Sequence, residues 1–382
     1  MLPEGSWLGC LGGGQLGRMF VHAAQAMGYK VLVLDPDGSG PAAQSADDVI
    51  VAAYDDTAAI AAFGKRVAAV TTEFENVPAA SLEALAAIVP TRPSAAAVRI
   101  AQDRRKEKRF FAEHGLPVGE FAVIERAEQL RDAPASLFPG ILKTATLGYD
   151  GKGQQRVSSS TQALLAWMSM KQAPCVLEAL IPFELEISVL VARSVEGDVR
   201  VWPVQENQHV NGVLDLTIVP ARIDDTLREK AQTLARQLVI SLDYVGVLCA
   251  EMFVTKAGVL LNEIAPRPHN SGHYTIEACV TSQFEQQVRV LAGAPLGDTS
   301  LVRSAVMVNV LGDVWFEAAS DKTAPMPPAW TDVLALPETH LHRYGKAEPR
   351  NARKMGHVTC TAATVGQALA SAAAVKRALR IA

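Results

Sequence analysis

The sequence lacks an excess of positive charge. Its 36 lysines and arginines are outnumbered by 40 aspartates and glutamates, and the formal net charge is −4. A protein that grips a phosphate backbone needs a basic surface, which this composition does not supply. We therefore expect no nucleic-acid partner.

Paired cysteines and long hydrophobic runs are missing as well. The five cysteines are scattered and contain no Cys-x-x-Cys pair, which excludes a disulfide framework and a cysteine-based zinc site. No stretch approaches the roughly 18 apolar residues that cross a bilayer, and the N-terminus does not have the pattern of a signal peptide. We expect a cytoplasmic protein that does not contact membranes.

The first hundred residues alternate between strand-like and helical segments. Buried strands are predicted at Trp7–Leu11, Lys30–Asp35 and Val67–Phe74, with a helix over Gln15–Met27. This order predicts an α/β domain at 1–100 with a Rossmann-like parallel sheet and helices on both faces. Its ligands are expected at the carboxyl ends of the strands.

The rest of the chain predicts an α+β arrangement in two further domains. The texture changes near residue 101, and a second domain is predicted over 101–295 with a smaller third one over 296–382. Within the second domain, Leu227–Ile240 predicts an amphipathic helix. Gly246–His273 predicts two strands joined by a tight turn.

A glycine loop follows the first strand. In "GGGQLGRM", Gly12, Gly14 and Gly17 precede and enter a helix, as in loops that cradle phosphates with backbone amides. Asp35 ends the next strand, where a ribose-binding acid of a dinucleotide site would stand. At this point a dinucleotide, another phosphate ligand and a purely structural turn all remain open.

Two acids interrupt the apolar strands of the predicted hairpin. Glu251 and Glu263 are 12 residues apart, so strands joined near Lys256–Gly258 can aim both at one point. Carboxylates among apolar residues carry a desolvation penalty, for which a divalent cation such as Mg²⁺ compensates. The alternative is a pair of exposed acids on an edge hairpin.

A second glycine loop and a second acid pair lie upstream. In the stretch "ILKTATLGYDGKGQ", a predicted strand ends in Lys143. A glycine-rich loop that can cover phosphates follows it. "CVLEALIPFELEISVLV" places Glu178 and Glu186 on either side of an apolar connection. This combination is typical of a site for a nucleotide base and its ribose.

The order of these features resembles the ATP-grasp superfamily. Four stretches, "GGGQLGRM", "TTEFENVP", "GYDGKGQ" and "NEIAPRPHNSGHYT", are similar to the 5-(carboxyamino)imidazole ribonucleotide synthases of purine biosynthesis. The resemblance implies an ATP-grasp architecture with a mobile lid at about 118–182 and a small β-rich C-terminal domain. It also implies a homodimer that uses ATP, Mg²⁺, bicarbonate and aminoimidazole ribonucleotide.

The resemblance also carries over the nucleotide site, residue by residue. Glu251 and Glu263 would bind magnesium, and the site would hold two of these ions. ATP would be held by Arg104, Lys143, Gly148, Tyr149, Asp150, Gly151, Lys152, Gly153, Gln154, Glu178, Ala179, Leu180, Ile181, Glu186, His209, Asn262 and Glu263.

The remaining implied residues serve the other two substrates. Arg267, His269 and Asn270, together with Lys143, would be catalytic around bicarbonate. The ribonucleotide would contact Gln15, Leu16, Glu73, Tyr149, Asp150, Asn270, Lys346, Arg353 and Lys354. His273 is a weaker candidate for a direct role, and we expect His340 and His342 to be structural.

The sequence departs from the family pattern in two places. Leu147 stands where many relatives have a glycine, and Asn351 and Ala352 stand where a Pro-Gly pair is common. The alternatives to the family assignment are another ATP-grasp ligase, such as a formate-dependent ribonucleotide transformylase, a nicotinamide dehydrogenase, and a nonenzymatic nucleotide sensor. A nicotinamide dehydrogenase would give no role to Glu251, to Glu263 or to the second glycine loop.

Overall fold

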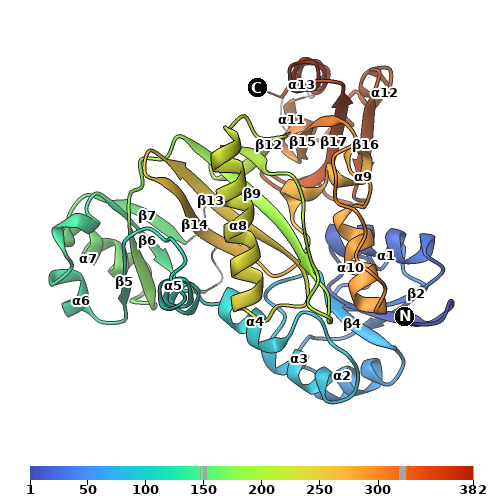
Figure 1. Ribbon diagram of the computed structural model, residues 1–382, viewed down its shortest axis with the longest axis horizontal. Helices are drawn as coiled ribbons and strands as arrows, with labels where there is room; N and C mark the ends of the chain where they lie inside the picture. The colour runs from blue at the N-terminus through green and yellow to red at the C-terminus, as the bar shows by residue number, and fades with distance from the viewer. Residues whose placement is uncertain (147, 149–152, 318–323, 382) are drawn as a thin grey trace.

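The computed structural model describes residues 1–146, 148, 153–317 and 324–381 (Figure 1). Three sheets organise these residues: a parallel sheet near the N-terminus, a long mixed sheet through the middle and the C-terminal part, and a small antiparallel sheet at the far side. This arrangement confirms the predicted mixed α/β fold class.

The N-terminal sheet is parallel, as predicted, with the strand order β3-β2-β1-β4. Helices cover both faces, and one of them, α10, comes from much later in the chain and packs on α1. The short strand β3 was not predicted, because only four residues form it and none is fully buried. The elements are β1 (Trp7–Leu11), α1 (Gln15–Ala26), β2 (Lys30–Asp35), β3 (Asp48–Val51), α2 (Thr57–Gly64), β4 (Ala69–Thr72), α3 (Ala79–Ala86), α4 (Ala95–Ala101) and α10 (Gln283–Ala292).

The central sheet has the order β14-β13-β9-β11-β12-β15-β17-β16, with β10 paired to β9. Its neighbouring strands β9 and β13 are long and mostly buried, and they carry much of the largest hydrophobic core cluster. The first six strands by sequence are β9 (Leu185–Arg193), β10 (Val199–Val201), β11 (Gln205–Val210), β12 (Val213–Val219), β13 (Gly246–Thr255) and β14 (Gly258–Ala265).

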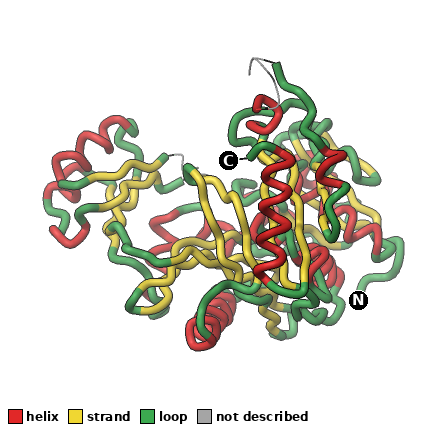
Figure 2. The backbone as a smooth tube through the Cα atoms, turned by 90° about the horizontal axis from the view of Figure 1, so that it is seen from above, coloured by secondary structure: helices red, strands yellow, loops and turns green. Residues whose placement is uncertain are grey.

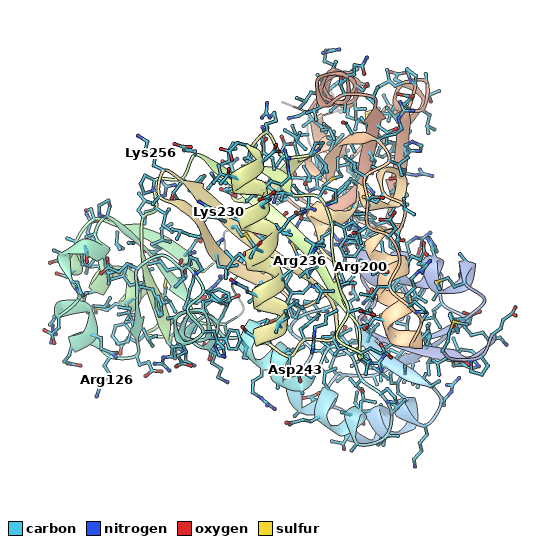
Figure 3. The ribbon with its side chains drawn as sticks, in the orientation of Figure 1. Arg126, Arg200, Lys230, Arg236, Asp243 and Lys256 are labelled. Carbon is cyan, nitrogen blue, oxygen red and sulfur yellow. The ribbon has the colours of Figure 1, made fainter. Side chains whose placement is uncertain are left out.

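Helix α8 (Asp225–Ser241) lies across the front of this sheet (Figure 1). Ala231, Leu234 and Leu238 face the core, whereas Lys230 and Arg236 lie exposed along the outer side of the helix (Figure 3). This split follows the 3.6-residue period of an amphipathic helix. None of the described helices is long and apolar enough to span a membrane.

The C-terminal strands continue the central sheet. Strand β15 pairs with β12, and β17 and β16 follow it. Because hydrogen bonds join the last strands to the middle of the chain, the predicted boundary near 295 lies within one continuous architecture and stays a prediction. The elements are α9 (Thr275–Ala278), β15 (Ser304–Leu311), α11 (Asp313–Glu317), α12 (Trp330–Leu334), β16 (Thr339–Arg343), β17 (Lys354–Ala362) and α13 (Val365–Leu379).

The small antiparallel sheet has the order β5-β8-β6-β7 and projects from the body with two helices packed on it (Figure 2). It falls within the region expected to form the lid, whose boundaries stay a prediction. The elements are α5 (Arg104–Glu113), which leads into it, β5 (Phe121–Ile124), α6 (Ala127–Arg131), β6 (Gly140–Thr144), β7 (Gln154–Val157), α7 (Ser160–Ser169) and β8 (Cys175–Ala179).

The turn before β17 is strained at the position where the family usually has glycine. Ala352 has φ of +58°, in the left-handed region that Cβ-bearing residues disfavour. Its amide donates a 2.8 Å hydrogen bond to Asp313 Oδ2, which helps to hold the conformation. The turn therefore keeps a glycine-like backbone without glycine.

We predict that Ala352→Gly raises the free energy of unfolding by up to about 1 kcal/mol, because glycine adopts this φ without strain and loses only part of the gain to chain entropy. The matched control is Ala373→Gly on the exposed face of α13, which should lower it by about 1 kcal/mol. Urea unfolding measures both. A loss of stability in both variants would contradict a strained turn.

Candidate active site

Glu251 and Glu263 stand directly opposite each other on β13 and β14. The exposed turn that carries Lys256 joins these two strands (Figure 3), and a register shift follows Glu251. Directly opposed residues of an antiparallel pair project to the same face of the sheet. The predicted convergence of the two acids is confirmed.

Each of these acids has a cationic partner. Arg104 Nη1 lies 2.5 Å from Glu263 Oε2, and His269 Nε2 lies 3.0 Å from Glu251 Oε1. Burial raises the pKa of Glu263, but Arg104 and Lys143 outweigh it and lower the pKa to about 2. The hairpin is at the sheet edge, yet its acids are paired and not simply solvated.

A buried carboxylate with two lysines lies beside this pair. Glu178, at the end of β8, lies 3.1 Å from Lys143 on β6 and 3.1 Å from Lys108 on α5. Burial raises the pKa of Glu178, whereas Lys108 and Lys143 lower it to a net value below the usual range. Lys108 also donates a 2.8 Å hydrogen bond to the carbonyl of Asn262, which ties α5 to β14.

Helix α5 is rich in charged residues, but two of its charged side chains are buried and not solvated. Glu107 and Lys108 are each only 2 % exposed, and they share one helix face with Arg104 and Phe111. The Glu107 carboxylate accepts a hydrogen bond from the Ile264 amide. The i, i+3, i+4, i+7 spacing of these four residues was the available signal, but charge on a helix ordinarily indicates solvent.

The predicted ribose end of the nucleotide site is formed by neighbouring strands. His209 Nδ1 on β11 lies 2.5 Å from Glu186 Oε2 on β9, and the two strands are paired. Burial lowers the pKa of His209, but the hydrogen bond to Glu186 raises it to a net value above the usual range. Ala179, Leu180 and Ile181 connect β8 to the segment before β9, between the two acids.

Only part of the second glycine loop is described. The carbonyl of Gly148 accepts a 3.4 Å hydrogen bond from Arg104, and Gly153 has φ of +71° with its carbonyl bonded to the Thr144 amide. Gln154 begins β7 and is exposed. The predicted ligands Tyr149, Asp150, Gly151 and Lys152, and the departure at Leu147, lie outside the described residues.

The segment after β14 presents donors without protein partners. Arg267 Nε donates to Glu75 and Nη1 donates to the Pro268 carbonyl, while no hydrogen bond within the described residues engages Nη2. Asn270 is 7 % exposed, and both polar atoms of its side chain have no hydrogen-bond partner there. Buried polar atoms of this kind ordinarily bond a ligand, an ion or an ordered water. Glu75, which orients Arg267, was missed because its partner is 192 residues away.

His273 does not join this group. It is fully buried and packs against His357, which in turn stacks on His342 with 4.4 Å between ring centroids. Burial, followed by the nearby His269, lowers the pKa of His273 well below its usual value. The weaker hypothesis of a direct role for His273 gains no support, while His342 pairs with Glu277 as a structural histidine would.

The first glycine loop has fewer backbone amides open to a phosphate than its motif suggests. Its amides are already bonded to carboxylates: Gly13 donates to Asp35, and Gly14 and Gly17 donate to Glu73. Asp35 also accepts a hydrogen bond from the Tyr54 hydroxyl. The dinucleotide hypothesis is therefore wrong, because both the phosphate amides and the ribose acid are engaged within the protein.

The predicted ribonucleotide residues gather where the N-terminal and C-terminal parts meet. Leu16 is 7 % exposed and packs with Phe284 and Tyr344, so it shapes a wall more than it offers a free contact, and Gln15 precedes it on α1. Gln44 donates a hydrogen bond to the Gly345 carbonyl, which joins the two parts. Nearby, Lys346 Nζ bonds the Lys354 carbonyl and Arg353 Nη1 bonds the Glu348 carbonyl.

Known families match along the chain. The ribonucleotide synthetase preATP-grasp domain matches residues 6–102, the ATP-grasp domain matches 109–284, and the phosphoribosylaminoimidazole carboxylase C-terminal domain matches 305–371. These matches confirm the resemblance found in the motifs.

Close relatives and solved structures span the whole chain. N5-carboxyaminoimidazole ribonucleotide synthase of Brucella melitensis is 45% identical over 362 residues, or 94% of this chain and 97% of that protein. The Bacillus subtilis protein of the same name is 40% identical, covering 94% and 92%. A crystal structure of an N5-carboxyaminoimidazole ribonucleotide synthetase with ADP has a TM-score of 0.91 and 44% identity, covering 100% of this chain and 97% of that one.

A more distantly related solved structure contains two bound nucleotides. The Aspergillus clavatus N5-carboxyaminoimidazole synthase, in complex with ADP and 5-aminoimidazole ribonucleotide, has a TM-score of 0.89 and 32% identity and covers 99% of each chain. The chain belongs to the N5-carboxyaminoimidazole ribonucleotide synthase family of ATP-grasp ligases, which act in purine biosynthesis.

Proposed function

We propose that the chain carries out the reaction of this family. Bicarbonate is joined to the 5-amino group of aminoimidazole ribonucleotide while ATP is split to ADP and phosphate, which yields 5-(carboxyamino)imidazole ribonucleotide. The observation that carries the proposal is the pair Glu251 and Glu263, opposed across two strands and flanked by Lys143 and Arg104. In a site for a metal and a polyphosphate, carboxylates bind the metal and nearby cationic side chains bind the phosphates.

The residues present fit magnesium. Two carboxylates on one face offer hard oxygen ligands, and the buried Oδ1 atom of Asn262 beside them has no hydrogen-bond partner among the described residues. No group of three or more His, Cys, Asp or Glu side chains is arranged for a metal in the described part of the chain. Two ions held by Glu251 and Glu263 would therefore complete their coordination with phosphate oxygens, and would neutralise charge on the transferring phosphoryl group.

The chain's own cations would complete the nucleotide site. Lys143 on β6 and Arg104 on α5 approach the acids from a different sheet and helix, so a triphosphate between them would be clamped from two sides. The connection from Glu178 to Ile181 would contact the base, and Glu186 the ribose. The glycine loop would cover the phosphates and exclude water.

The acceptor end would lie past β14. Bicarbonate oxygen attacks the terminal phosphate and forms carboxyphosphate, which Arg267 and Asn270 would hold with their unpartnered donors. Loss of phosphate frees carbon dioxide, and the exocyclic amine of the ribonucleotide attacks its carbon. The substrate would be bound by Gln15, Glu73, Lys346, Arg353 and Lys354 at the junction of the first and last domains. A cytoplasmic homodimer remains part of this proposal.

The direct test combines the protein with ATP, magnesium, bicarbonate and aminoimidazole ribonucleotide and measures ADP and the carboxylated product. We expect product formation to depend on all four components. ADP release that ignores the imidazole substrate, or turnover with formate in place of bicarbonate, would contradict the assignment and favour another ATP-grasp ligase.

We predict that Glu263→Gln lowers kcat by at least about 100-fold, because it removes one of two charges that hold the metal while the side chain keeps its size. Steady-state kinetics at saturating ATP and magnesium measures the loss. Glu113→Gln at the exposed end of α5 serves as the control and should retain wild-type turnover. Near-normal activity of a folded Glu263→Gln protein would remove this residue from the site.

We predict that Lys108→Met raises KM for ATP about 10-fold or more and lowers the free energy of unfolding by about 3 kcal/mol at pH 7, because Glu178 stays buried with one cation fewer. Lys106→Met, two residues earlier and exposed, is the matched control. ATP titration and urea unfolding measure the two effects.

The same variant has a predicted pH dependence. The lowered pKa of Glu178 contributes stability that is present above its unfolded value of about 4.3 and is lost as the pH falls through the folded value. The stability deficit of Lys108→Met should therefore be largest near pH 7 and shrink below about pH 4. An equal deficit at both pH values would show that packing, and not charge, is responsible.

A further inference from the structure

A chain of buried polar side chains leads away from His269 into the central sheet. His269 Nδ1 lies 2.9 Å from Ser271 Oγ, which lies 2.9 Å from Ser188 Oγ on β9. Ser188 Oγ is also 2.8 Å from Asn207 Nδ2 and 3.1 Å from Gln205 Oε1, both on β11. Both serines are fully buried. The imidazole therefore has an anchored side, Nδ1, and a side that faces the acids, Nε2.

Counting hydrogens gives this chain a direction. Gln205 Nε2 uses its two hydrogens on the Pro203 carbonyl at 2.5 Å and the Tyr274 hydroxyl at 2.9 Å, so its Oε1 atom must accept from Ser188. The Ser188 hydroxyl lies within hydrogen-bond distance of both Gln205 Oε1 and Ser271 Oγ, but its single hydrogen serves only one of them. With that hydrogen on Gln205, which can only accept, the Ser188 oxygen accepts from Asn207 and from Ser271.

The last hydrogen bond in this series is the one between Ser271 and His269. Because Ser271 donates to Ser188, its oxygen accepts the hydrogen on His269 Nδ1. The Ser271 amide also points at Nδ1, but from 3.3 Å, so the hydroxyl is the closer partner. Nε2 is thereby turned towards Glu251, 3.0 Å from its Oε1 atom.

We propose that Ser271 is a positioning residue for His269: its hydroxyl, held by Ser188, fixes the imidazole so that Nε2 faces the acceptor end of the site. This proposal rests on the proposed function, because it assumes that His269 acts on bicarbonate or on carboxyphosphate. Hydrogen-bond partners behind a functional histidine set its ring orientation, and their removal typically costs about 10- to 100-fold in activity.

The variant Ser271→Ala tests the proposal. We expect kcat/KM for bicarbonate to fall about 10- to 100-fold while KM for ATP and the unfolding midpoint change little. Ser81→Ala is the matched control, because it removes another buried hydroxyl, one that bonds the Tyr54 carbonyl among the N-terminal elements. An equal loss in both serine variants would overturn the proposal.

A double-mutant cycle separates positioning from a general structural role. In a His269→Asn background, Ser271→Ala should add less than about a twofold effect, since nothing remains to be positioned. The imidazole ¹⁵N resonances of His269 should shift in the single variant Ser271→Ala, which reports the lost contact without any turnover. Full additivity, or unchanged resonances, would overturn the proposal.

The cycle also distinguishes the two levels of the account. If His269→Asn lowers activity and Ser271→Ala does not, the positioning role is wrong and the proposed function stands. If His269→Asn is fully active, the predicted catalytic role of His269 at the bicarbonate end is wrong, and the positioning role of Ser271 is wrong with it.

Discussion

Two carboxylates that face each other across paired strands constrain everything around them. Glu251 and Glu263 would repel each other on a partly buried surface unless positive charge lay close by. In this structure His269 and Arg104 supply that charge, and Glu178 repeats the pattern with two lysines. The site is therefore neutralised from within, and each of its cations is one that an anionic ligand could use.

On this account, a bound ligand would replace the present ionic partners of Glu251 and Glu263. If a magnesium ion takes the carboxylates of Glu251 and Glu263, Arg104 is released towards the phosphates and His269 towards the bicarbonate end. Because these side chains are partly buried, their interactions with a transferring phosphoryl group would be stronger than on an open surface. The same residues thus stabilise the free protein and prepare its chemistry.

The sequence was sufficient for the parts of the site that depend on local order. The opposition of the two acids follows from a tight turn between apolar strands, and the place of Lys143 at the end of β6 follows from the composition of that strand. Partners from distant parts of the chain could not be predicted. Helical periodicity could have placed Lys108 on a buried face, but nothing local indicated that Arg267 would pair with Glu75.

The first glycine loop is a second case in which contacts with distant residues could not be predicted from the sequence. Its motif suggested a free phosphate cradle, because sequence shows the amides but not the carboxylates of Asp35 and Glu73 that occupy them. Buried His273 was equally ambiguous, since a histidine near a site and a histidine in a packed stack have the same local sequence. In both cases tertiary contacts decided between hypotheses that the motif left open.

The most direct test of the central claim is a crystal structure with ADP and Mn²⁺, read from the anomalous signal of the metal. The account predicts manganese between the carboxylates of Glu251 and Glu263, with Arg104 turned from Glu263 to the phosphates. A metal bound elsewhere, or Arg104 still paired with Glu263 beside a bound nucleotide, would contradict it.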